Sequence, residues 1–486
     1  MKRLLFLILS LWLYAEGAYS QNTTRPNVLF FIIDDLNDWI SVLNKDNPIK
    51  MPNLERLAKE GVLFTHAYAS SPSCNPSRAS MLTGTRPNKT GVYSNASDWR
   101  NALPNAITIQ RYFKDRGYFV CGSGKIFHHQ FNWAFHDNAS FDEYLMMSIS
   151  EPYPDKKLNG YDWFGTQNTD WGVWPGDIKK TADYRTAEYA VEKLQQNFDQ
   201  PFFLNVGIFK PHSPFFAPQE FFDKYPLSKL TMPKLYEGDT LDLPSGAKQL
   251  FSLTDKGYGS GRGFWKGLLR AKTENPEVYK EFVQAYQACA TFADSMVGKV
   301  LDALDKSPYK NNTIIVLCAD NGFHLGEKDH IEKFVLWEKA THVPFIIVAP
   351  GVTKSGMVIT KPVDLTTIYP TLVDLCGFEV PKTLDGFSLT PLLKDTSVKI
   401  PPALMTYLKG NHAIRTERWR FIHYADGTEE LYDHSTDENE WHNLAGNPRY
   451  QKIMDELRTY LPKQNAESVP DLKRPAGQVN AESKFN

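Results

Sequence analysis

The stretch VLFFIIDD (residues 28–35) places six consecutive apolar residues directly before two aspartates. An apolar run of strand length, without alternation, is typical of a β-strand that is buried on both faces. Three further segments repeat this pattern of an apolar run that leads into polar residues: 119–122, 202–207 and 313–318. We therefore predict buried strands that each deliver chemically active side chains at their carboxyl ends.

Helical segments lie between these strands. Their apolar residues recur at helical spacing, and a glycine directly follows two of them, at Gly61 and Gly117. We predict helices over residues 53–60, 107–116, 184–197 and 277–306. Strands that alternate with helices predict an α/β fold, with a mostly parallel sheet between helices.

The pattern changes near residue 402. Four short strand-like segments precede a helical segment over residues 449–461, and they span 404–408, 413–416, 420–424 and 430–432. We predict a main domain over residues 21–400 and a small α+β subdomain, an antiparallel sheet plus a helix, over residues 401–465. Residues 466–486 are polar and contain two prolines, so we expect a disordered tail there.

The amino terminus has the pattern of a secretory signal peptide. A charged start, residues 1–3, precedes an apolar run over residues 4–13, and Ala18 and Ser20 occupy cleavage-like positions. The run is short for a membrane span, so we expect residues 1–20 to be removed, with a retained anchor as the alternative. The mature protein is expected to be exported, periplasmic or secreted in a bacterium, without stable membrane association.

Charge and cysteine content narrow the class of protein further. The net charge of −2 excludes a globally basic surface, so nucleic acid is not an expected partner. Four of the five cysteines lie in apolar segments and are interpreted as small core residues: Cys121, Cys289, Cys318 and Cys376.

Cys74 differs from the other cysteines because it directly precedes Asn-Pro-Ser-Arg. Pro76 suits the first turn of a helix, here over residues 75–83. The amino end of a helix favours a nucleophile and an anionic substrate. From these residues alone, a disulfide partner, a metal ligand, a thiolate nucleophile and a chemically modified residue all remain open.

The sequence around Cys74 resembles the signature of type I sulfatases. The motif CNPSR (74–78) continues to LTGTR (82–86), and in that family Cys-x-Pro-x-Arg directs oxidation of the cysteine to Cα-formylglycine. Four other blocks resemble the iduronate-2-sulfatase-like branch: GKIFH (124–128), KPHSPF (210–215), ATHVP (340–344) and ELYD (430–433). The resemblance implies an alkaline-phosphatase-like fold, a sulfuric ester hydrolase and a formylglycine-generating maturation enzyme as partner.

Two pairs of oxygen ligands end two of the predicted strands. Asp34 and Asp35 end the first, and Asp320 and Asn321 follow residues 313–318. A divalent cation would neutralise these carboxylates, and we expect one Ca²⁺ per chain, with Mg²⁺ as the alternative. With the sulfatase metal site as a guide, the predicted ligands are Asp34, Asp35, Cys74, Asp320 and Asn321.

Four cations are candidates for holding a sulfate ester and stabilising charge on its oxygens: Arg78, Lys125, Lys210 and Lys333. The resemblance implies that Arg78 and Lys125 hold the formylglycine, and that Lys125 and Lys333 contact the sulfate. Lys328 competes with Lys333 for this role, because the intervening residues vary.

Two histidines that follow strand ends are candidate acid–base groups, because the unperturbed pKa of histidine is ~6.5. The resemblance implies that His212 protonates the departing alcohol and that His128 takes a proton when sulfate is expelled, with His129 as an alternative. It also implies that Asp320 helps to deprotonate the nucleophile.

The resemblance implies an enzyme that hydrolyses sulfate esters on a carbohydrate. Resemblance to iduronate-2-sulfatases suggests a polysaccharide or oligosaccharide with uronate or hexose units, such as a glycosaminoglycan or an algal polymer. Trp99 and Arg100 are candidate substrate-binding residues, because aromatic rings stack on sugars and arginine pairs with a uronate carboxylate. One alternative is a phosphomonoester or phosphodiester hydrolase with the same fold. Another is a non-catalytic carbohydrate-binding protein, for which 23 tyrosines and 11 tryptophans would supply stacking surfaces.

Overall fold

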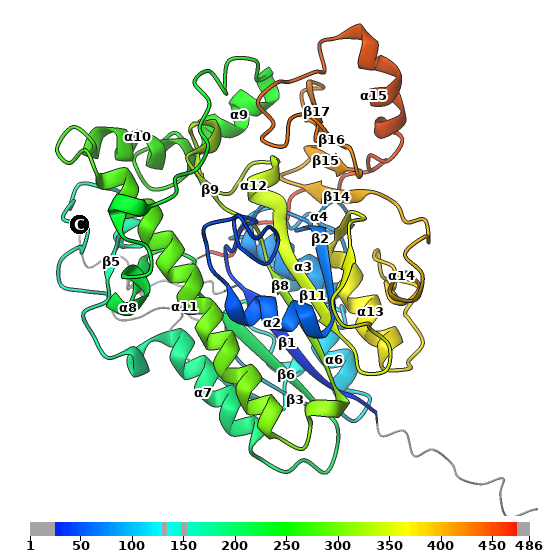
Figure 1. The fold of residues 1–486 in the computed structure, drawn as a ribbon. Coiled ribbons are helices and arrows are strands. Elements are labelled where there is room, and N and C mark those ends of the chain that lie inside the picture. Colours follow the sequence, from blue (N-terminus) through cyan, green and yellow to red (C-terminus); the bar gives the residue numbers. More distant parts are fainter. Residues whose placement is uncertain (1–24, 129–133, 147–152, 474–486) are drawn as a thin grey trace, which may run out of the picture.

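A computed structural model describes residues 25–128, 134–146 and 153–473 (Figure 1). The predicted signal peptide, His129 and residues 474–486 of the predicted tail lie outside the described residues. Every helix within the described ranges is too short or too polar to cross a membrane.

A nine-stranded sheet forms the centre of the main body. Strand β1 (Asn27–Ile33) lies between β6 (Phe202–Ile208) and β8 (Thr313–Ala319) and is parallel to both. The strand order is β12-β2-β11-β8-β1-β6-β3-β4, and β13 also pairs with β2. The other strands are β2 (Val62–Tyr68), β3 (Phe119–Gly124), β4 (Glu143–Leu145), β11 (His342–Val348), β12 (Met357–Ile359) and β13 (Val363–Asp364).

The sheet is mostly parallel, as predicted, but β11 runs antiparallel to β2 and β8. All residues of β1, β6 and β8 are buried, as their mostly apolar sequences predict. Asn205 interrupts the apolar run of β6, and its side chain is hydrogen-bonded to Gln110 and to the Cys121 carbonyl. Two short sheets lie outside the central one: β5 (Trp171–Val173) with β7 (Phe215–Ala217), and β9 (His324–Leu325) with β10 (Ile331–Glu332).

Helices cover both faces of the central sheet (Figure 1). One layer contains α2 (Pro52–Glu60), α7 (Ala182–Leu194) and α11 (Val278–Lys306), and the other contains α3 (Cys74–Thr83), α6 (Ile109–Lys114) and α13 (Ile368–Leu375). The four predicted helices are present, with small shifts at their ends. The other helices that precede the small carboxyl-terminal sheet are α4 (Pro87–Thr90), α5 (Trp99–Ala102), α8 (Gln219–Phe222), α9 (Ser245–Thr254), α10 (Gly261–Ala271), α12 (Glu338–Thr341) and α14 (Thr390–Lys394).

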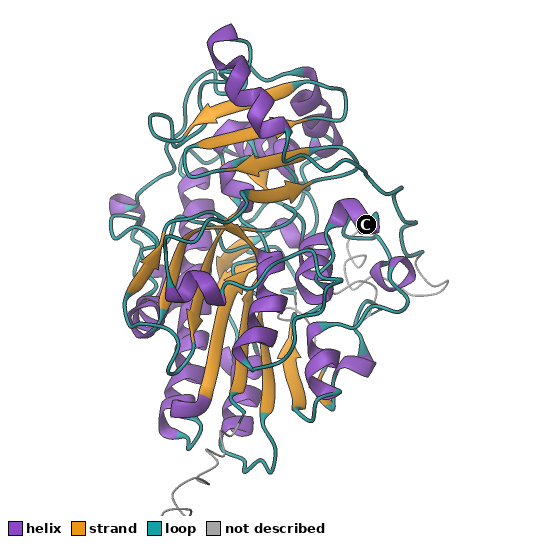
Figure 2. Ribbon diagram, turned by 90° about the vertical axis from the view of Figure 1, so that its right-hand side faces the viewer, coloured by secondary structure: helices purple, strands orange, loops and turns teal. Residues whose placement is uncertain are grey.

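A small antiparallel sheet follows near the carboxyl terminus, and Figure 2 shows it beyond one end of the central sheet. Its strands are β14 (Ala403–Thr406), β15 (His412–Arg415), β16 (Trp419–His423) and β17 (Glu429–Asp433). Helix α15 (Gln451–Arg458) packs on it, and Met454 and Leu457 of this helix join a core with Ile414, Phe421 and Leu431.

The predicted disordered tail is wrong for its first part, residues 466–473. The backbone N–H of Ala466 donates to the carbonyl of Asn88 at 2.8 Å, and that of Val469 donates to the carbonyl of Gly91 at 3.0 Å. Residues 464–472, here named the carboxyl-terminal strap, therefore run along α4 and the loop that follows it. The polar composition of this segment did not reveal that it is ordered, because backbone hydrogen bonds do not require apolar side chains.

Candidate active site

The polar residues that follow four strands gather at one edge of the central sheet, because parallel strands end at the same edge. Asp34 and Asp35 continue β1, and Asp320 and Asn321 continue β8; all four are buried. The backbone N–H of Asp35 donates to Asp320 Oδ1 at 3.2 Å, and Asn321 Nδ2 donates to Asp35 Oδ1 at 2.7 Å. The two strand ends are thus joined directly.

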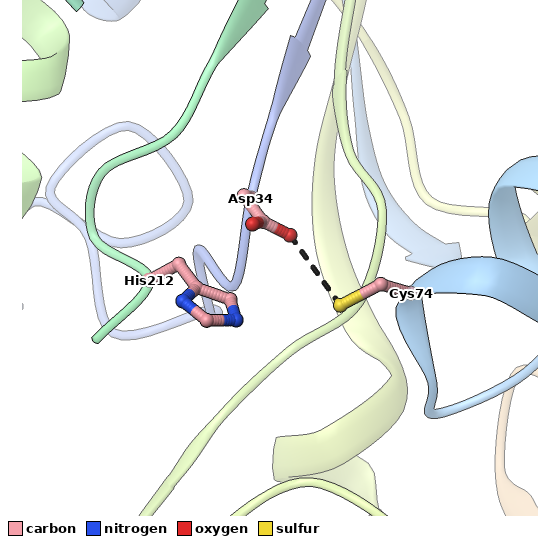
Figure 3. Close-up of side chains that lie close together, drawn as sticks. All are labelled: Asp34, Cys74 and His212. Carbon is pink, nitrogen blue, oxygen red and sulfur yellow. Dashed lines mark hydrogen bonds between the residues drawn. The ribbon is translucent and has the colours of Figure 1, made fainter. Parts of the chain in front are cut away.

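Helix α3 begins at Cys74 and brings its side chain to the same edge (Figure 3). Cys74 Sγ lies 3.5 Å from Asp34 Oδ1 and 3.8 Å from Asp35 Oδ1. Cys74 forms no disulfide with another cysteine of the described ranges. Burial, with a smaller contribution from Asp34, raises the pKa of the Cys74 thiol well above its usual range. The unmodified thiol is therefore neutral at pH 7 and a poor nucleophile.

One ligand atom from each of four side chains lies within 4.8 Å of the others, and these side chains are Asp34, Asp35, Cys74 and Asp320. The Oδ1 atom of buried Asn321 has no hydrogen-bond partner within the described residues. An orphaned amide oxygen beside three carboxylates suits a hard cation with oxygen ligands. The donor set fits a divalent cation.

Arg78 and Lys125 neutralise the carboxylates from one side. Arg78 Nε donates to Asp320 Oδ2 at 2.7 Å, and Arg78 Nη2 lies 3.3 Å from Asp34 Oδ1. The Lys125 ammonium pairs with Asp34 Oδ2. Although burial opposes ionisation, Lys125, His212 and Arg78 hold the pKa of Asp34 well below its usual range. Burial raises the pKa of Asp320 to about 7, against the opposing effect of Arg78.

Lys333 reaches the site from a loop with unusual backbone geometry. Its ammonium pairs with Asp35 Oδ1 and donates to Cys74 Sγ at 3.0 Å. The neighbours Glu332 and Phe334 have φ values of 78° and 73°, a left-handed conformation that costs about 1–3 kcal/mol for such residues. Strain of this kind persists only where the surroundings enforce it, and the Phe334 N–H donates to the Pro72 carbonyl at 3.0 Å.

Lys328, the competitor of Lys333, is used elsewhere. Its ammonium lies 2.7 Å from Asp239 Oδ1 and also donates to the backbone carbonyl of Glu440. The structure therefore places Lys333, not Lys328, beside Cys74.

His212 and His128 both lie near the charged groups of the site. Figure 3 shows the His212 ring beside Asp34 and Cys74. His212 Nδ1 lies 2.6 Å from the Ser213 carbonyl, which only accepts, so Nδ1 carries the proton, and Nε2 lies 3.8 Å from Asp35 Oδ2. Burial lowers the pKa of His212 to about 4, although Asp35 opposes it. Burial and Lys125 lower the pKa of His128, whose Nδ1 has no partner within the described residues. Both rings are neutral near pH 7.

Comparison with known proteins agrees with this arrangement. A family model described as Sulfatase matches residues 26–378, and one described as N-sulphoglucosamine sulphohydrolase, C-terminal, matches residues 326–467. The chain belongs to the sulfatase family. This sulfatase is 37% identical to a sulfatase of Formosa agariphila, over 96% of this chain and 93% of the relative.

Two further similarities define its place among known proteins. The sulfatase is 32% identical to human iduronate 2-sulfatase, over 77% of this chain and 74% of that protein. The phosphonate monoester hydrolase of Silicibacter pomeroyi has a TM-score of 0.73 and 23% identity, over 89% of this chain and 94% of that one, which shows the fold alone. The protein is a sulfuric ester hydrolase with the predicted alkaline-phosphatase-like fold, so the non-catalytic alternative is not retained.

The structure does not support Trp99 as a wall of the sugar pocket. Trp99 is 1% exposed, its ring stacks on Phe127, and its Nε1 donates to the Phe135 carbonyl at 3.0 Å. The Arg100 guanidinium lies 4.1 Å from the centre of the Trp99 ring and 2.8 Å from Asp137 Oδ2. The prediction for Trp99 is wrong because the ring is interior packing, and Arg100 is already paired with a carboxylate.

Lys210 lies close to the site but its role stays a prediction. Its side chain is buried, and Nζ donates to the Pro214 carbonyl at 2.6 Å. The Phe209 ring, which also contacts His212, lies 5.3 Å from this ammonium.

Tyr286 of helix α11 contributes to the site but is absent from the predicted residues. Its Oη donates to the Asp35 carbonyl at 2.8 Å and accepts from the Asn37 N–H at 3.0 Å. These contacts hold Asp35 at φ 60°, which is unusual for aspartate. Nothing in the local sequence marks Tyr286, because Asp35 lies 251 residues earlier in the chain.

Proposed function

We propose that this sulfatase removes sulfate from a carbohydrate, with residue 74 as the nucleophile after oxidation of Cys74 to Cα-formylglycine. The observation that carries the proposal is the position of Cys74 Sγ, 3.0 Å from Lys333 Nζ and 3.5 Å from Asp34 Oδ1. A buried neutral thiol is poorly suited to attack at this point, which supports modification by a formylglycine-generating enzyme.

We further propose that Ca²⁺, with Mg²⁺ as the alternative, is held by Asp34, Asp35, Asp320, Asn321 and residue 74. The orphaned Asn321 Oδ1 and the four clustered ligand atoms support this set. Calcium prefers oxygen to sulfur, so an oxygen-bearing residue 74 suits the ion better than a thiol does. When bound, the ion would supply positive charge opposite the oxygens of the sulfate ester.

The hydrated aldehyde at residue 74 would supply one hydroxyl for attack on sulfur and a second that allows sulfate to leave. Asp320 lies in the same cluster, and its pKa of about 7 suits transient acceptance of a proton. Arg78 fixes the orientation of Asp320 through the 2.7 Å contact. Lys125 and Lys333 offer ammonium groups to the sulfate oxygens.

The two histidines would handle the remaining protons. His212 Nε2 faces the cluster and would donate to the departing sugar oxygen once it is protonated. An anionic ester bound beside the ring raises its pKa from about 4, which favours that protonation. His128 is neutral and its Nδ1 is without a partner in the described structure, so it is available to accept a proton as sulfate leaves.

We infer that the substrate is a sulfated poly- or oligosaccharide with uronate or hexose units, such as a glycosaminoglycan or an algal polymer. The identity with human iduronate 2-sulfatase supports this class. The signal-peptide pattern supports export, in a bacterium to the periplasm or outside the cell, where the enzyme would encounter such polymers.

The test is expression together with a formylglycine-generating enzyme, followed by assays on an aryl sulfate, an aryl phosphate and a panel of sulfated oligosaccharides. We expect sulfate ester turnover, an aldehyde mass on the peptide that contains residue 74, and an inert Cys74→Ala variant. Cys121→Ala is the matched control, since Cys121 is buried in β3 away from the cluster. Full activity of Cys74→Ala would reject the nucleophile, and preference for the phosphate would favour a phosphoester hydrolase.

A further inference from the structure

We propose that the loop over residues 94–97 positions residue 74 for reaction, and that the carboxyl-terminal strap holds this loop in place. Asn95 is the positioning residue in this arrangement. The inference rests on the proposed function of residue 74 as the nucleophile, and it assigns no contact between Asn95 and the substrate.

Asn95 ties together the residues on either side of position 74. Its Oδ1 accepts from Ser73 Oγ at 2.7 Å and from the Asn75 backbone N–H at 3.0 Å. In return, Asn75 Nδ2 donates to the carbonyl of Ser94 at 3.0 Å and to that of Ser97 at 2.8 Å. Four hydrogen bonds thus connect one loop to the start of α3.

Asn95 does the work of a helix cap at the start of α3. Ser73 occupies the N-cap position with extended backbone, but its side chain makes no cap hydrogen bond. The first N–H groups of a helix have no partner within the helix, and a side-chain oxygen ordinarily satisfies one of them. Asn95 Oδ1 takes the N–H of Asn75, a residue that is 1% exposed and has no solvent to replace that partner.

The strap fixes the loop from its outer side. The Leu472 N–H donates to the Ala96 carbonyl at 2.7 Å, and Ser94 Oγ donates to Asp471 Oδ1 at 2.8 Å. At Gly91, with φ 73°, an added Cβ would lie 2.0 Å from the Glu467 carbonyl oxygen, so only glycine allows this close approach. The chain's last described segment is therefore connected to the catalytic helix through a single loop.

The kinetic test compares Asn95→Ala with Asn95→Asp and with Asn101→Ala, the last being an exposed asparagine of the following helix. Asn95 lies outside the CNPSR motif, so maturation is expected to proceed, and rates are divided by the aldehyde content of each sample. Expression in a bacterium avoids glycosylation at the Asn95-Ala96-Ser97 sequence. We expect kcat of Asn95→Ala on an aryl sulfate to fall roughly tenfold or more, with little change in KM, because small misplacements of reacting groups have large effects.

Asn95→Asp should recover most of kcat, because a carboxylate oxygen accepts the same two hydrogen bonds. Asn101→Ala should match the wild type. A wild-type kcat in Asn95→Ala, or equal losses in Asn95→Ala and Asn101→Ala, would overturn the proposal.

Hydrogen exchange provides a readout that does not depend on activity. In Asn95→Ala, amide exchange should increase in the peptide that contains residues 73–78 and stay unchanged in β1, and Asp471→Ala should produce a smaller increase in both the loop and this peptide. Unchanged exchange at residues 73–78 would overturn the inference even if the protein is inactive. A wild-type protein without sulfatase activity, but with the expected exchange, would instead reject the proposed function and keep the structural link.

Discussion

This protein has two buried clusters of charged side chains. In both clusters carboxylates lie close together, but the clusters differ in how the carboxylates are neutralised. The catalytic cluster consists of Asp34, Asp35, Asp320, Arg78, Lys125 and Lys333. The second, here named the subdomain cluster, lies between α12 and the small sheet and consists of Glu338, Glu440, His434, Arg415 and Arg420. In each cluster at least three potential metal ligands lie within 4.8 Å of one another.

In the subdomain cluster, arginine compensates both glutamates. Arg420 Nε lies 2.7 Å from Glu440 Oε1, Arg420 Nη2 pairs with Glu338 Oε2, and Arg415 Nε lies 3.3 Å from that same oxygen. Although burial opposes ionisation, Arg420 and the neighbouring cations lower the pKa of both glutamates. These acids are ionised and paired, so the cluster has no need of a metal ion.

The catalytic cluster also pairs its carboxylates with cations, since Arg78, Lys125 and Lys333 contact Asp34, Asp35 and Asp320, but two of its ligand groups are less well satisfied. The pKa of Asp320 is raised to about 7, and Asn321 Oδ1 has no partner within the described residues. The comparison teaches that close carboxylates do not by themselves indicate a metal site. A metal site is indicated instead by buried ligand atoms that lack a hydrogen-bond partner or are incompletely neutralised. Binding of a cation or a substrate stabilises such atoms.

The largest expected effect comes from removing one carboxylate from each cluster. Asp34→Asn should lower both the bound calcium per chain and the aryl sulfatase kcat/KM, the latter at least about 10³-fold, since a metal ion supplies several kcal/mol of charge stabilisation. Glu338→Gln should leave the bound calcium unchanged. Elemental analysis and steady-state kinetics on folded protein measure both quantities. Wild-type enzyme that stays active and metal-free after chelation would contradict the calcium site.

Arg420→Met should lower the stability of the protein and leave its catalytic activity unchanged. Arg420 is fully buried, and its loss leaves Glu338 and Glu440 without their main partner, so the free energy of unfolding should fall by about 3–5 kcal/mol. The kcat of the folded fraction should be unchanged. Urea unfolding measures the loss, and the double variant with Glu338→Gln should lose less than the sum of the two single variants. A fall in kcat at unchanged stability would place Arg420 in catalysis.

His212 and His434 form a matched pair across the two clusters, because each lies beside buried carboxylates. His212→Ala should lower the rate on sugar sulfates about 10²- to 10⁴-fold and affect an activated aryl sulfate much less, because the phenolate leaves without a proton. His434→Ala should show no such dependence on the leaving group. Equal losses on both substrates for His212→Ala would indicate a binding role.

The smallest effect is expected at Asp433, in an ion pair at the surface of the small sheet. Arg418 donates to both oxygens of Asp433, at 2.9 and 2.6 Å, and these bonds lower the pKa of Asp433 to about 2. Since the unfolded pKa is ~3.9, the stabilisation is present above about pH 4 and is lost as the pH falls toward 2. Asp433→Asn should remove this part of the pH dependence, measured by urea unfolding at about pH 5 and about pH 3. The change is small because Arg418 is 58% exposed and water screens the pair. If the variant loses as much stability between about pH 5 and about pH 3 as the wild type does, other carboxyl groups cause the loss.

The sequence by itself determined the central strands and most of the catalytic cluster. Mostly apolar runs of strand length are stable when both of their faces are buried, so residues 28–33, 202–207 and 313–318 are predicted as interior strands. The aspartates that follow two of these runs must then meet at one edge of the sheet. The CNPSR motif added the nucleophile position through its resemblance to a family with a long and specific signature.

Only the tertiary structure decided which side chains complete the site. Lys333 contacts Cys74, whereas Lys328 is paired with Asp239, and Trp99 is interior packing rather than a surface for stacking a sugar. Tyr286 and the carboxyl-terminal strap support the site from distant parts of the chain. Local sequence patterns record burial and backbone preference, which act over a few residues. Contacts between segments hundreds of residues apart form when whole helices and strands pack together. The spacing of apolar residues within one segment does not predict these contacts.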